Sequence, residues 1–514
     1  MSRPIQFPHE SRSNAVRETI TEKEPVALRT FTPSQAVFTK SAGVFHWTSD
    51  GRRLYDYSSG VLVANLGHNP RRWMRRFCGS MGWKPEHVGR PSEAVQDRSR
   101  IRENSADRET DGRILTNSAT TSADGLGGPS YGEGADYFEA VTLTAYNAIT
   151  EIEANAVDRL LKNLRSFPGG SRLDSVMWAA SGSEAIQKAL WACLHRDETR
   201  DVIIATRHGF HGKKGLAGAV TGSEKDRDRD PRVKFISFPM QECDDISKSG
   251  DEIDLSKYEA ELESLKAEYG DRLCCLITEP YLGGGGSYHP QKEYLQLLQS
   301  FCHENGVLFI LDEVQSNFGR TGCMYAFETY GIEPDIVCLG KGLGNGVPVS
   351  AAVGRGDVFA SLKYGEGSDT WSANPLACAA VLATLDEFEG TDVLENTRRL
   401  SQQFTVALNR LKETGLIAKV RGEGMVFGIE CADAGDLPAK DVANEIVKAC
   451  YLGREGGDGI HLLGPLANTV IRVSPPMTMT AAEARDSLKL LYELINGVAE
   501  RIAAKSFAVG ARKV

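Results

Sequence analysis

The sequence predicts an α/β fold in which a parallel sheet is flanked by helices. After residue 135, short apolar runs alternate with helical patterns, which is typical of such a sheet. The runs are almost unbroken in their apolar character, which predicts strands that are covered on both faces. With 514 residues the chain exceeds one hydrophobic core, so we expect two or more packed units.

Two segments of different character precede the predicted sheet. Residues 36–57 alternate apolar and polar side chains around the turn signals Ser41-Ala42-Gly43 and Asp50-Gly51, which predicts a short antiparallel meander. Residues 88–135 are rich in Arg, Asp, Ser and Gly, so they cannot easily offset their own ordering entropy. We expect a mobile surface insertion there, with an active-site lid as the alternative.

Five apolar runs are the predicted strands of the sheet. They cover residues 176–180, 202–205, 273–277, 307–311 and 335–339. From about residue 390 a helical pattern leads into further strands and helices, which predicts a separate C-terminal domain. The apolar positions of that pattern are Val393, Leu394, Leu400, Phe404, Leu408 and Leu411.

Composition excludes several classes of partner. The net charge is −10 and there is no Lys/Arg stripe interleaved with aromatic residues, so nucleic acid is not expected. The N-terminal segment is polar and no apolar stretch is long enough to cross a bilayer, so we expect neither secretion nor membrane insertion. The 11 cysteines form an odd count without a C-x-x-C pair, which favours a cytoplasmic location. Small molecules are the expected partners.

A polar motif follows each of the five apolar runs. In chain order the motifs are Ser181-Gly182-Ser183-Glu184, Arg207-His208-Gly209-Phe210-His211-Gly212, Thr278-Glu279-Pro280, Asp312-Glu313-Val314-Gln315 and Gly340-Lys341-Gly342. In open parallel sheets, ligands bind beyond the carboxyl ends of the strands. The motifs therefore predict one shared crevice.

The first motif is a candidate phosphate site. Ser181 and Glu184 have the spacing of a capping box, and apolar residues with helical period follow them. Gly182 and Ser183 would then lie at a helix N-terminus, where free N–H groups and the helix dipole attract an anion. Taken alone, an ordinary capped helix is the alternative.

Two ionisable residues stand at the ends of predicted buried strands. A carboxylate at Asp312 is costly there unless it meets a cation, such as a pyridinium nitrogen. A structural salt bridge is the alternative, and we assign no metal because no His stands at ligand spacing beside it. Desolvation would lower the pKa of Lys341 and make its amine a nucleophile toward an aldehyde. A snorkelling lysine is the alternative for Lys341 alone, but the five motifs together favour the nucleophile.

The motifs resemble those of class III aminotransferases, the family of ornithine, acetylornithine and 4-aminobutyrate aminotransferases. The blocks that carry the resemblance are SGSEAIQKAL, FHGKK, ITEP, LFILDEVQSNFGRTG, LGKGLGNGVPVSAAVG, DTWSANPLACAA, VRGEGMVFGIE and IRVSPP. It implies the pyridoxal 5′-phosphate (PLP)-dependent transferase fold type I, with a mainly parallel seven-stranded sheet in a large domain, residues 136–388. A smaller α+β domain would be built from residues 1–87, which also supply dimer contacts, and from residues 389–514. The expected assembly is a homodimer, or a dimer of dimers, with active sites at the subunit interface.

The resemblance also implies a role for each motif residue in holding PLP. Lys341 would bind the cofactor as a Schiff base and carry the proton during catalysis, with Asp312 and Glu279 as the other catalytic residues. The cofactor-binding residues would be Gly182 and Ser183 at the phosphate, Phe210 and His211 at the ring, Asp312 at the ring nitrogen, Val314 on the opposite face and Gln315 at the ring hydroxyl. Thr370 would reach the phosphate bound in the partner subunit.

The function that the resemblance implies is amino-group transfer by a ping-pong mechanism. The donor would be an amine or amino acid of the 4-aminobutyrate, ω-amino acid or diamine type, and the acceptor a keto acid such as 2-oxoglutarate or pyruvate. A PLP-dependent decarboxylase or aminomutase on the same fold is the alternative, and a non-catalytic binding protein is a third.

Three positions depart from the family pattern and concern the substrate. Lys213 stands where ornithine-type members have an arginine that grips a carboxylate, and a lysine offers only a point charge. Gly284 stands where relatives have a glutamate that pairs with the arginine of the RxxPP block, so we expect Arg472 to bind the α-carboxylate of the keto acid. A structural ion pair is the alternative for Arg472. Val61 replaces a tyrosine of ornithine-type members, which predicts a wider, more apolar pocket and argues against ornithine.

Overall fold

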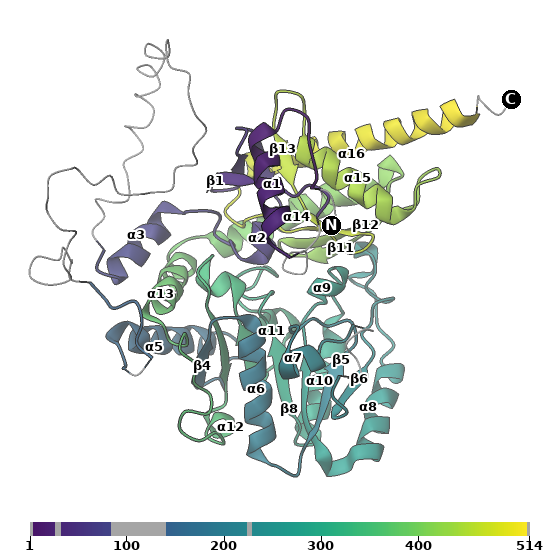
Figure 1. The fold of residues 1–514 in the computed structure, drawn as a ribbon. Coiled ribbons are helices and arrows are strands. Elements are labelled where there is room, and N and C mark those ends of the chain that lie inside the picture. The colour runs from purple at the N-terminus through teal and green to yellow at the C-terminus, as the bar shows by residue number, and fades with distance from the viewer. Residues whose placement is uncertain (1–3, 26–31, 84–139, 147, 224–228, 511–514) are drawn as a thin grey trace, which may run out of the picture.

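The chain folds into two lobes, shown in the computed structural model of Figure 1. The structure describes residues 4–25, 32–83, 140–146, 148–223 and 229–510. The segment predicted as an insertion, residues 88–135, lies outside them. The domain boundaries proposed above stay a prediction. No helix in the described ranges is long and apolar enough to span a membrane.

The large lobe is built on a seven-stranded sheet. In spatial order its strands are β4 (Ser175–Ala179), β10 (Ser350–Gly354), β9 (Ile336–Leu339), β8 (Leu308–Asp312), β7 (Leu273–Thr278), β5 (Val202–Thr206) and β6 (Val233–Ile236). Neighbours from β9 to β6 run parallel, whereas β10 pairs antiparallel with both β4 and β9. All five predicted strands are present, and the mainly parallel sheet of the α/β fold is confirmed.

Alternate residues of the central strands face two different hydrophobic clusters. In β8, Phe309 and Leu311 belong to one cluster and Leu308 and Ile310 to the other, and all four are buried. This alternation explains the unbroken apolar runs, because both faces of the strand are covered.

Helices cover both faces of the sheet. The face with the smaller cluster carries α6 (Gly182–Arg196), α7 (Gly215–Ala219) and α12 (Gly356–Phe359). The other face carries α5 (Glu151–Arg165), α8 (Ser256–Tyr269), α10 (Lys292–Glu304) and α11 (Ala326–Tyr330), and α13 (Pro375–Gly390) packs beside α5. The single turn α9 (Gly283–Gly286) follows β7 and lies at the edge that faces the small lobe (Figure 1).

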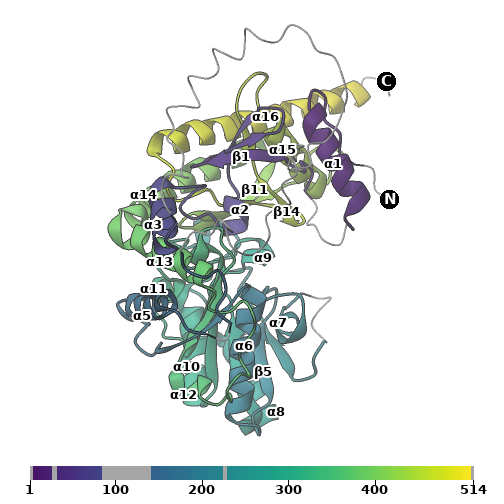
Figure 2. The ribbon, with the colours of Figure 1, turned by 60° about the vertical axis from the view of Figure 1, so that its left-hand side comes forward.

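The small lobe joins the two ends of the chain. Its first sheet has the order β1 (Phe38–Ala42), β2 (Phe45–Thr48), β3 (Arg53–Asp56) and β13 (Gly459–His461). The first three strands form the predicted antiparallel meander, and β13 adds to β3 in parallel from a point about 400 residues later in the chain. Figure 2 shows the N-terminal helix α1 (Ser11–Lys23) and the C-terminal helix α16 (Ala481–Gly510) in the same lobe.

The second sheet of the small lobe is made entirely of C-terminal residues. It is antiparallel, in the order β11 (Ile417–Glu423), β12 (Val426–Cys431), β15 (Val470–Val473) and β14 (Leu463–Ala467). The helices of this segment are α14 (Val393–Arg410) and α15 (Ala439–Leu452). The apolar positions predicted for α14 pack inward, since Leu400, Phe404 and Leu408 are fully buried.

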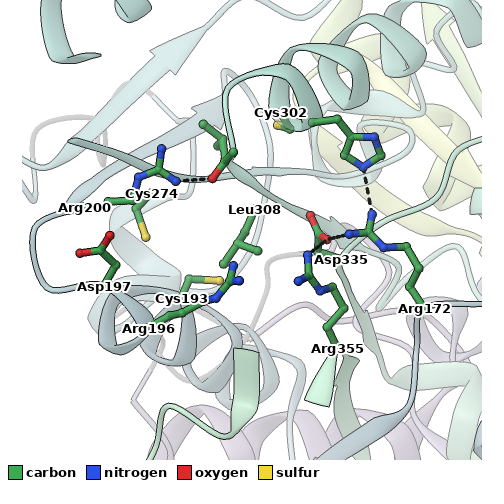
Figure 3. A pocket seen from close by; sticks show the side chains of 13 residues that line it. Arg172, Cys193, Arg196, Asp197, Arg200, Cys274, Cys302, Leu308, Asp335 and Arg355 are labelled. Carbon is green, nitrogen blue, oxygen red and sulfur yellow. Dashed lines mark hydrogen bonds and ion pairs between the residues drawn. The ribbon is translucent and has the colours of Figure 1, made fainter. Parts of the chain in front are cut away.

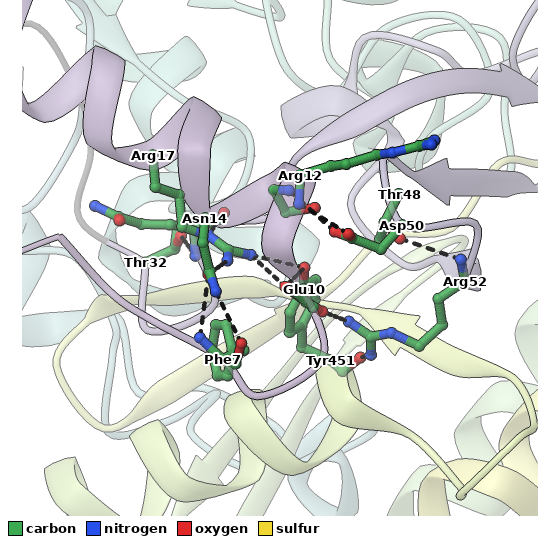
Figure 4. A network of polar contacts seen from close by, with 12 residues as sticks. Phe7, Glu10, Arg12, Asn14, Arg17, Thr32, Thr48, Asp50, Arg52 and Tyr451 are labelled. Carbon is green, nitrogen blue, oxygen red and sulfur yellow. Dashed lines mark hydrogen bonds and ion pairs between the residues drawn. The ribbon is translucent and has the colours of Figure 1, made fainter. Parts of the chain in front are cut away.

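A buried ion-pair network fastens the N-terminal helix to the C-terminal segment (Figure 4). Arg17 of α1 donates to the carboxylate of Glu10 over 2.7 Å, and Arg52 donates to the other oxygen of the same carboxylate. Tyr451 of α15 donates its hydroxyl to Glu10 over 3.0 Å and accepts from Arg17 over 2.9 Å. Because Glu10 and Arg17 are buried, loss of one partner would leave a desolvated charge behind.

A tight left-handed turn connects β3 to the lobe interface. The single turn α2 (Ser59–Leu62) has positive φ at Ser59 (46°), Val61 (67°) and Leu62 (61°). Such a backbone costs roughly 1–2 kcal/mol per L-residue, so neighbouring contacts must hold it. The chain then leads into α3 (Arg71–Ser80), whose Trp73 donates to Thr384 of α13 over 3.0 Å.

Candidate active site

A cavity of about 370 Å³ lies where β4, β5, β7, β8 and β9 end. Residues of all five polar motifs line it, together with residues from the loop before β10. The lining residues are Val63, Ala180, Ser181, Gly182, Ser183, Phe210, His211, Glu279, Asp312, Val314, Gln315, Lys341, Gly346, Val347, Pro348, Val349 and Ser350. The convergence that the sequence predicted is therefore present in the fold.

A larger cavity of about 600 Å³ lies at the opposite end of the sheet (Figure 3). Its lining includes Arg172 and Arg355, which both pair with the buried carboxylate of Asp335, at 2.6 and 2.9 Å. None of the five motifs contributes to this cavity. The smaller cavity is the candidate active site, because the predicted motifs line it and do not line the larger one.

The start of α6 forms one wall of the candidate site. Ser181 accepts from the N–H of Glu184, and the Glu184 carboxylate accepts from the N–H of Ser181 over 2.9 Å, which completes the predicted capping box. A side chain at Gly182 would lie 2.8 Å from Val314, so only glycine fits there. The first turn of this 15-residue helix thus opens toward the cavity, where its N–H groups can bind a phosphate.

Asp312 and His211 form a buried pair on the floor of the cavity. Oδ2 of Asp312 lies 2.7 Å from Nδ1 of His211, and Oδ1 accepts from the N–H of Val314 over 3.0 Å. The other ring nitrogen of His211, Nε2, is buried and has no hydrogen-bond partner among the described residues. The carboxylate of Asp312 is therefore fixed, and the ring beside it carries a buried nitrogen without a partner.

Lys341 is placed by the two glycines that flank it. Its backbone is left-handed, with φ of 45°. A side chain at Gly340 would lie 2.5 Å from the hydroxyl of Ser350, and one at Gly342 would collide with the amide of Asn65. Packing thus requires the two glycines, while the left-handed backbone belongs to Lys341 itself.

Burial lowers the pKa of Lys341 below its usual range. The negative charges of Asp312 and Glu279 oppose this shift, and the positive charge of Arg472 adds to it. Because the amine is easier to deprotonate here than in water, Lys341 is suited to act as a nucleophile and as a proton carrier.

Glu279 ties two loops of the site together. Its carboxylate accepts from the N–H of Phe210 over 2.8 Å and from the N–H of Gly283 over 3.3 Å. Burial, with a smaller contribution from the charge of Asp312, raises the pKa of Glu279 to about 7. The side chain therefore acts on the site by holding Phe210 and the turn at Gly283 in place.

Gln315 lies directly against that turn. Its amide packs onto Gly283 so closely that a side chain at this glycine would collide with it. The amide oxygen of Gln315 is buried and has no hydrogen-bond partner among the described residues. This oxygen is the amide atom nearest to Gly283, so Gln315 is the second lining residue with an unpartnered polar atom.

Comparison with known proteins decides the family. The family described as Aminotransferase class-III matches residues 135–495. The chain belongs to the class III aminotransferases. The predicted resemblance, the enzyme class and the dependence on PLP are thereby confirmed, and the enzyme transfers an amino group between an amine or amino acid and a keto acid.

Individual class III aminotransferases are similar to this chain over most of its length. An acetylornithine aminotransferase of Clostridium acetobutylicum is 33% identical, over 63% of this chain and 78% of that protein. A 4-aminobutyrate aminotransferase of Mycobacterium leprae is 29% identical, over 64% of this chain and 75% of that protein. The crystal structure of the ornithine aminotransferase from Toxoplasma gondii superposes with a TM-score of 0.70 at 21% identity, covering 97% of this chain and 100% of that one, and confirms the fold.

The residues of the cavity fit PLP as this class III aminotransferase requires. Anion-binding N–H groups stand at Gly182 and Ser183, a fixed carboxylate at Asp312 and a desolvated amine at Lys341. Two residues that line the cavity, His211 and Gln315, also carry a buried polar atom without a hydrogen-bond partner among the described residues. The roles of the individual residues stay predictions.

Four of the predicted site residues do not line the cavity, namely Val61, Lys213, Thr370 and Arg472. Val61 is exposed on the left-handed turn, although Val63, two residues later, does line the cavity. Lys213 is exposed just before α7, and Thr370 is exposed in the turn that precedes α13. Their roles stay predictions, and for Thr370 the exposure agrees with a role in a partner subunit.

Arg472 is buried in β15 beside the candidate site without lining the cavity. Its guanidinium donates to the backbone carbonyl of Gly283, and among the described residues it has no ion pair with a carboxylate. The structure therefore places it next to the turn that carries Gly284, where relatives have the glutamate. Burial lowers the pKa of Arg472 below its usual range.

The sequence reasoning missed Ser350 and the residues from Gly346 to Val349. They reach the cavity because β10 runs antiparallel to its neighbours, so that its amino end lies at the same edge as the carboxyl ends of the other strands. The rule that ligands bind beyond the carboxyl ends of strands does not cover residues that precede an antiparallel strand. The block GVPVSAAVG begins five residues after Lys341, and its resemblance to the family was the one signal for these residues.

Proposed function

We propose that this class III aminotransferase takes its amino group from an ω-amino acid, 4-aminobutyrate or a diamine and passes it to a keto acid such as 2-oxoglutarate or pyruvate. The observation that carries the proposal is the environment of Arg472, a buried arginine at the active-site turn that pairs with a backbone carbonyl and with no described carboxylate. A desolvated cation without an anion is costly, and a substrate carboxylate would remove that cost.

The cofactor is held by residues that the cavity brings together. Gly182 and Ser183 would bind the phosphate at the start of α6, and Phe210 and Val314 would enclose the ring. Asp312 would pair with the protonated ring nitrogen, and Gln315 would bind the ring hydroxyl. When bound, PLP supplies an aldehyde carbon and an electron-accepting ring, which is the chemistry that no side chain provides.

Lys341 is the proton carrier at the reacting carbon. Its Nζ takes the proton from the amine-bearing carbon of the donor and returns it during the second half of the cycle. The lowered pKa of Lys341 favours the neutral amine more than water does, which suits a general base. Glu279 acts as a positioning residue, since it contacts Phe210 and Gly283.

Arg472 binds the α-carboxylate of the keto acid. The guanidinium offers a planar set of donors that matches a carboxylate, and one of them already meets the carbonyl of Gly283. Gly284 supplies no side chain that could compete for the guanidinium. The acceptor carboxylate would therefore meet an arginine that is in place but not neutralised.

No arginine stands among the residues that line the cavity, so the far end of the donor has no bidentate partner there. Val63 lines the cavity, Val61 stands nearby in sequence, and the exposed Lys213 replaces the arginine of ornithine-type relatives. These residues support a donor whose far end, whether an amine or a carboxylate, needs no bidentate partner.

The assembly that we propose is a homodimer. Thr370 lies in an exposed turn together with Trp371, whose side chain is 60% exposed, and neither residue lines the cavity of its own chain. An exposed tryptophan beside a hydroxyl donor supports a contact with the phosphate site of a second subunit.

The experiment that tests the proposal compares acceptors with and without a carboxylate. For Arg472→Ala we expect kcat/KM for pyruvate and 2-oxoglutarate to fall by at least about 30-fold, the loss typical of removing one member of a buried charge pair. For butanal, which has no carboxylate, we expect a change of less than about threefold by the same reasoning. Arg410→Ala, on the surface beside Glu413, is the control.

Unchanged kinetics with keto acids in Arg472→Ala would exclude the proposed role. An equal loss with butanal would instead assign Arg472 to the structure of the turn at Gly283. Donors are identified separately, by adding single amines and amino acids to the holoenzyme and following the cofactor absorbance in one half-reaction.

A further inference from the structure

Three histidines surround one buried aspartate in the first sheet of the small lobe. Asp56 ends β3, His46 lies in the neighbouring strand β2, and His68 follows the turn after α2. His461 ends β13 and is the direct register partner of Asp56. None of the four residues lines the active-site cavity.

The carboxylate of Asp56 is held rigidly by its own chain. Its Oδ1 accepts from the N–H of Ser58 (2.7 Å), from the hydroxyl of Ser58 (2.8 Å) and from the N–H of Ser59 (3.0 Å). This leaves Oδ2, which lies 2.7 Å from Nε2 of His68. The side chain of Asp56 is completely buried, so this oxygen must be satisfied within the cluster.

His46 presents a nitrogen that the protein does not satisfy. Its Nδ1 lies 2.7 Å from the hydroxyl of Ser41, which fixes the ring. Its Nε2 is buried, lies 3.5 Å from Oδ1 of Asp56, and has no hydrogen-bond partner among the described residues. If Nδ1 donates to Ser41 and the ring is neutral, the lone pair of Nε2 faces the carboxylate, and a cation between them would favour that arrangement.

Aromatic rings pack against two of the histidines, while His68 stays partly exposed. The ring of Phe38 stacks on His46 with centroids 4.0 Å apart and meets His461 edge-on at 4.9 Å. Nδ1 of His461 is also buried without a hydrogen-bond partner among the described residues. Two orphaned imidazole nitrogens beside one buried carboxylate are unusual for a purely structural network.

We propose that His46, His68 and Asp56 bind a zinc ion. Each of the three residues offers one ligand atom, and these atoms all lie within 4.8 Å of one another. The Nε2 atoms of both histidines face the carboxylate of Asp56, at 3.5 and 2.7 Å. Imidazole and carboxylate ligands suit zinc, and three protein ligands leave a fourth position for water beside His461. Ser41 on His46, and Ser58 and Ser59 on Asp56, are the outer partners that orient metal ligands.

The position of the cluster gives the ion a structural role. Asp56 stands three residues before the left-handed turn that starts at Ser59, and Val63 at the end of that turn lines the active-site cavity. The hydroxyl of Ser59 donates to the carbonyl of Ser474, two residues after Arg472. A metal that fixes Asp56 would thus hold both the turn and the end of β15. The inference is independent of the substrate proposed above.

The test is a zinc titration of the holoenzyme after treatment with a chelator and gel filtration. Bound zinc is measured by inductively coupled plasma mass spectrometry. We expect one zinc per chain in the wild type and in His195→Gln, whose histidine is exposed on α6. We expect affinity at least about tenfold weaker in His46→Gln, which loses a direct ligand.

A variant of an outer partner and a measurement of thermal stability show whether weaker zinc binding comes from the site or from misfolding. Ser41→Ala retains all three ligands and should weaken zinc binding by about tenfold, the lower end of the effect of losing an outer partner. Zinc should raise the thermal midpoint of the wild type and of His195→Gln but not that of His46→Gln. The midpoint without metal then shows whether each variant is folded.

Two results would overturn the proposal. One is wild-type protein that binds no more zinc than His46→Gln, which would make the cluster a hydrogen-bond network. The other is a thiolate charge-transfer band after substitution with cobalt, which would assign the metal to one of the 11 cysteines.

Discussion

Oδ2 of Asp312 lies 2.7 Å from Nδ1 of His211, and both side chains are almost completely buried at the floor of the active-site cavity. The histidine holds one oxygen of the Asp312 carboxylate, and the N–H of Val314 holds the other. A carboxylate held in this way needs no reorganisation when a cationic ring nitrogen arrives. This is the preorganised electrostatic stabilisation that supports large rate enhancements.

Asp312→Asn should keep the shape of this pair but remove its charge. We expect the rate of a single half-reaction to fall by about two to three orders of magnitude, the loss typical of removing one preorganised electrostatic contact. Stopped-flow absorbance of the cofactor measures that rate.

The matched control is the neighbouring buried glutamate. Glu313 accepts from the N–H groups of Ala326 and Phe327 at the start of α11 and does not line the cavity. Glu313→Gln should therefore change the half-reaction rate by only a few-fold while lowering the thermal midpoint. Equal loss of rate in both variants would contradict the role of Asp312.

The raised pKa of Glu279, about 7, predicts a dependence of stability on pH. The unfolded chain ionises this carboxyl near its ordinary pKa of 4.5, whereas the folded chain retains the proton until about pH 7. The contribution of Glu279 to stability is therefore fully present below pH 4.5 and is lost as the pH rises through 7. The shift corresponds to about 3 kcal/mol.

Glu279→Gln removes that titration. We expect the thermal midpoint of the wild type to fall more between pH 5 and pH 8 than that of the variant, in the absence of substrates. Glu304→Gln, on the exposed end of α10, should retain the wild-type pH dependence. Parallel profiles for wild type and Glu279→Gln would show that Glu279 is ionised throughout.

Gly284→Glu should convert the acceptor site toward that of the relatives. The new side chain starts 3.1 Å from Phe210, which requires only a small shift, and its carboxylate can pair with Arg472. We expect the KM for 2-oxoglutarate to rise by about tenfold or more, since the arginine is then occupied. Gly284→Gln has the same volume without the charge and should raise it much less. Equal effects of Glu and Gln would mean that bulk at this turn, and not the pairing of Arg472, determines acceptor binding.

The sequence predicted the sheet and the crevice because the relevant signals are local. Each predicted strand is a single apolar run, and each motif follows its strand directly, so the rule that ligands bind at carboxyl ends brought Ser183, Asp312 and Lys341 together. The spacing of Ser181 and Glu184 likewise determined the cap of α6. These features depend on contacts between residues close in the chain.

The features that escaped prediction depend on contacts between distant segments. The antiparallel direction of β10 brings Ser350 to the cavity, and nothing in the run SAAVG reveals that direction. The partner of Arg472 turned out to be the carbonyl of Gly283, which has no side-chain signature. His46 and His461 are separated by about 400 residues and meet only because β13 joins the N-terminal sheet.

The central claim is that Lys341 is the lysine that binds the cofactor covalently. Reduction of the holoenzyme with borohydride followed by peptide mapping in a mass spectrometer tests it directly. We expect the reduced pyridoxyl group on the peptide that contains Lys341. We expect Lys341→Ala to show no such adduct and to lack the absorbance band of a cofactor linked to lysine. An adduct on another lysine, such as Lys213, or an unmodified Lys341 in active enzyme, would contradict the account.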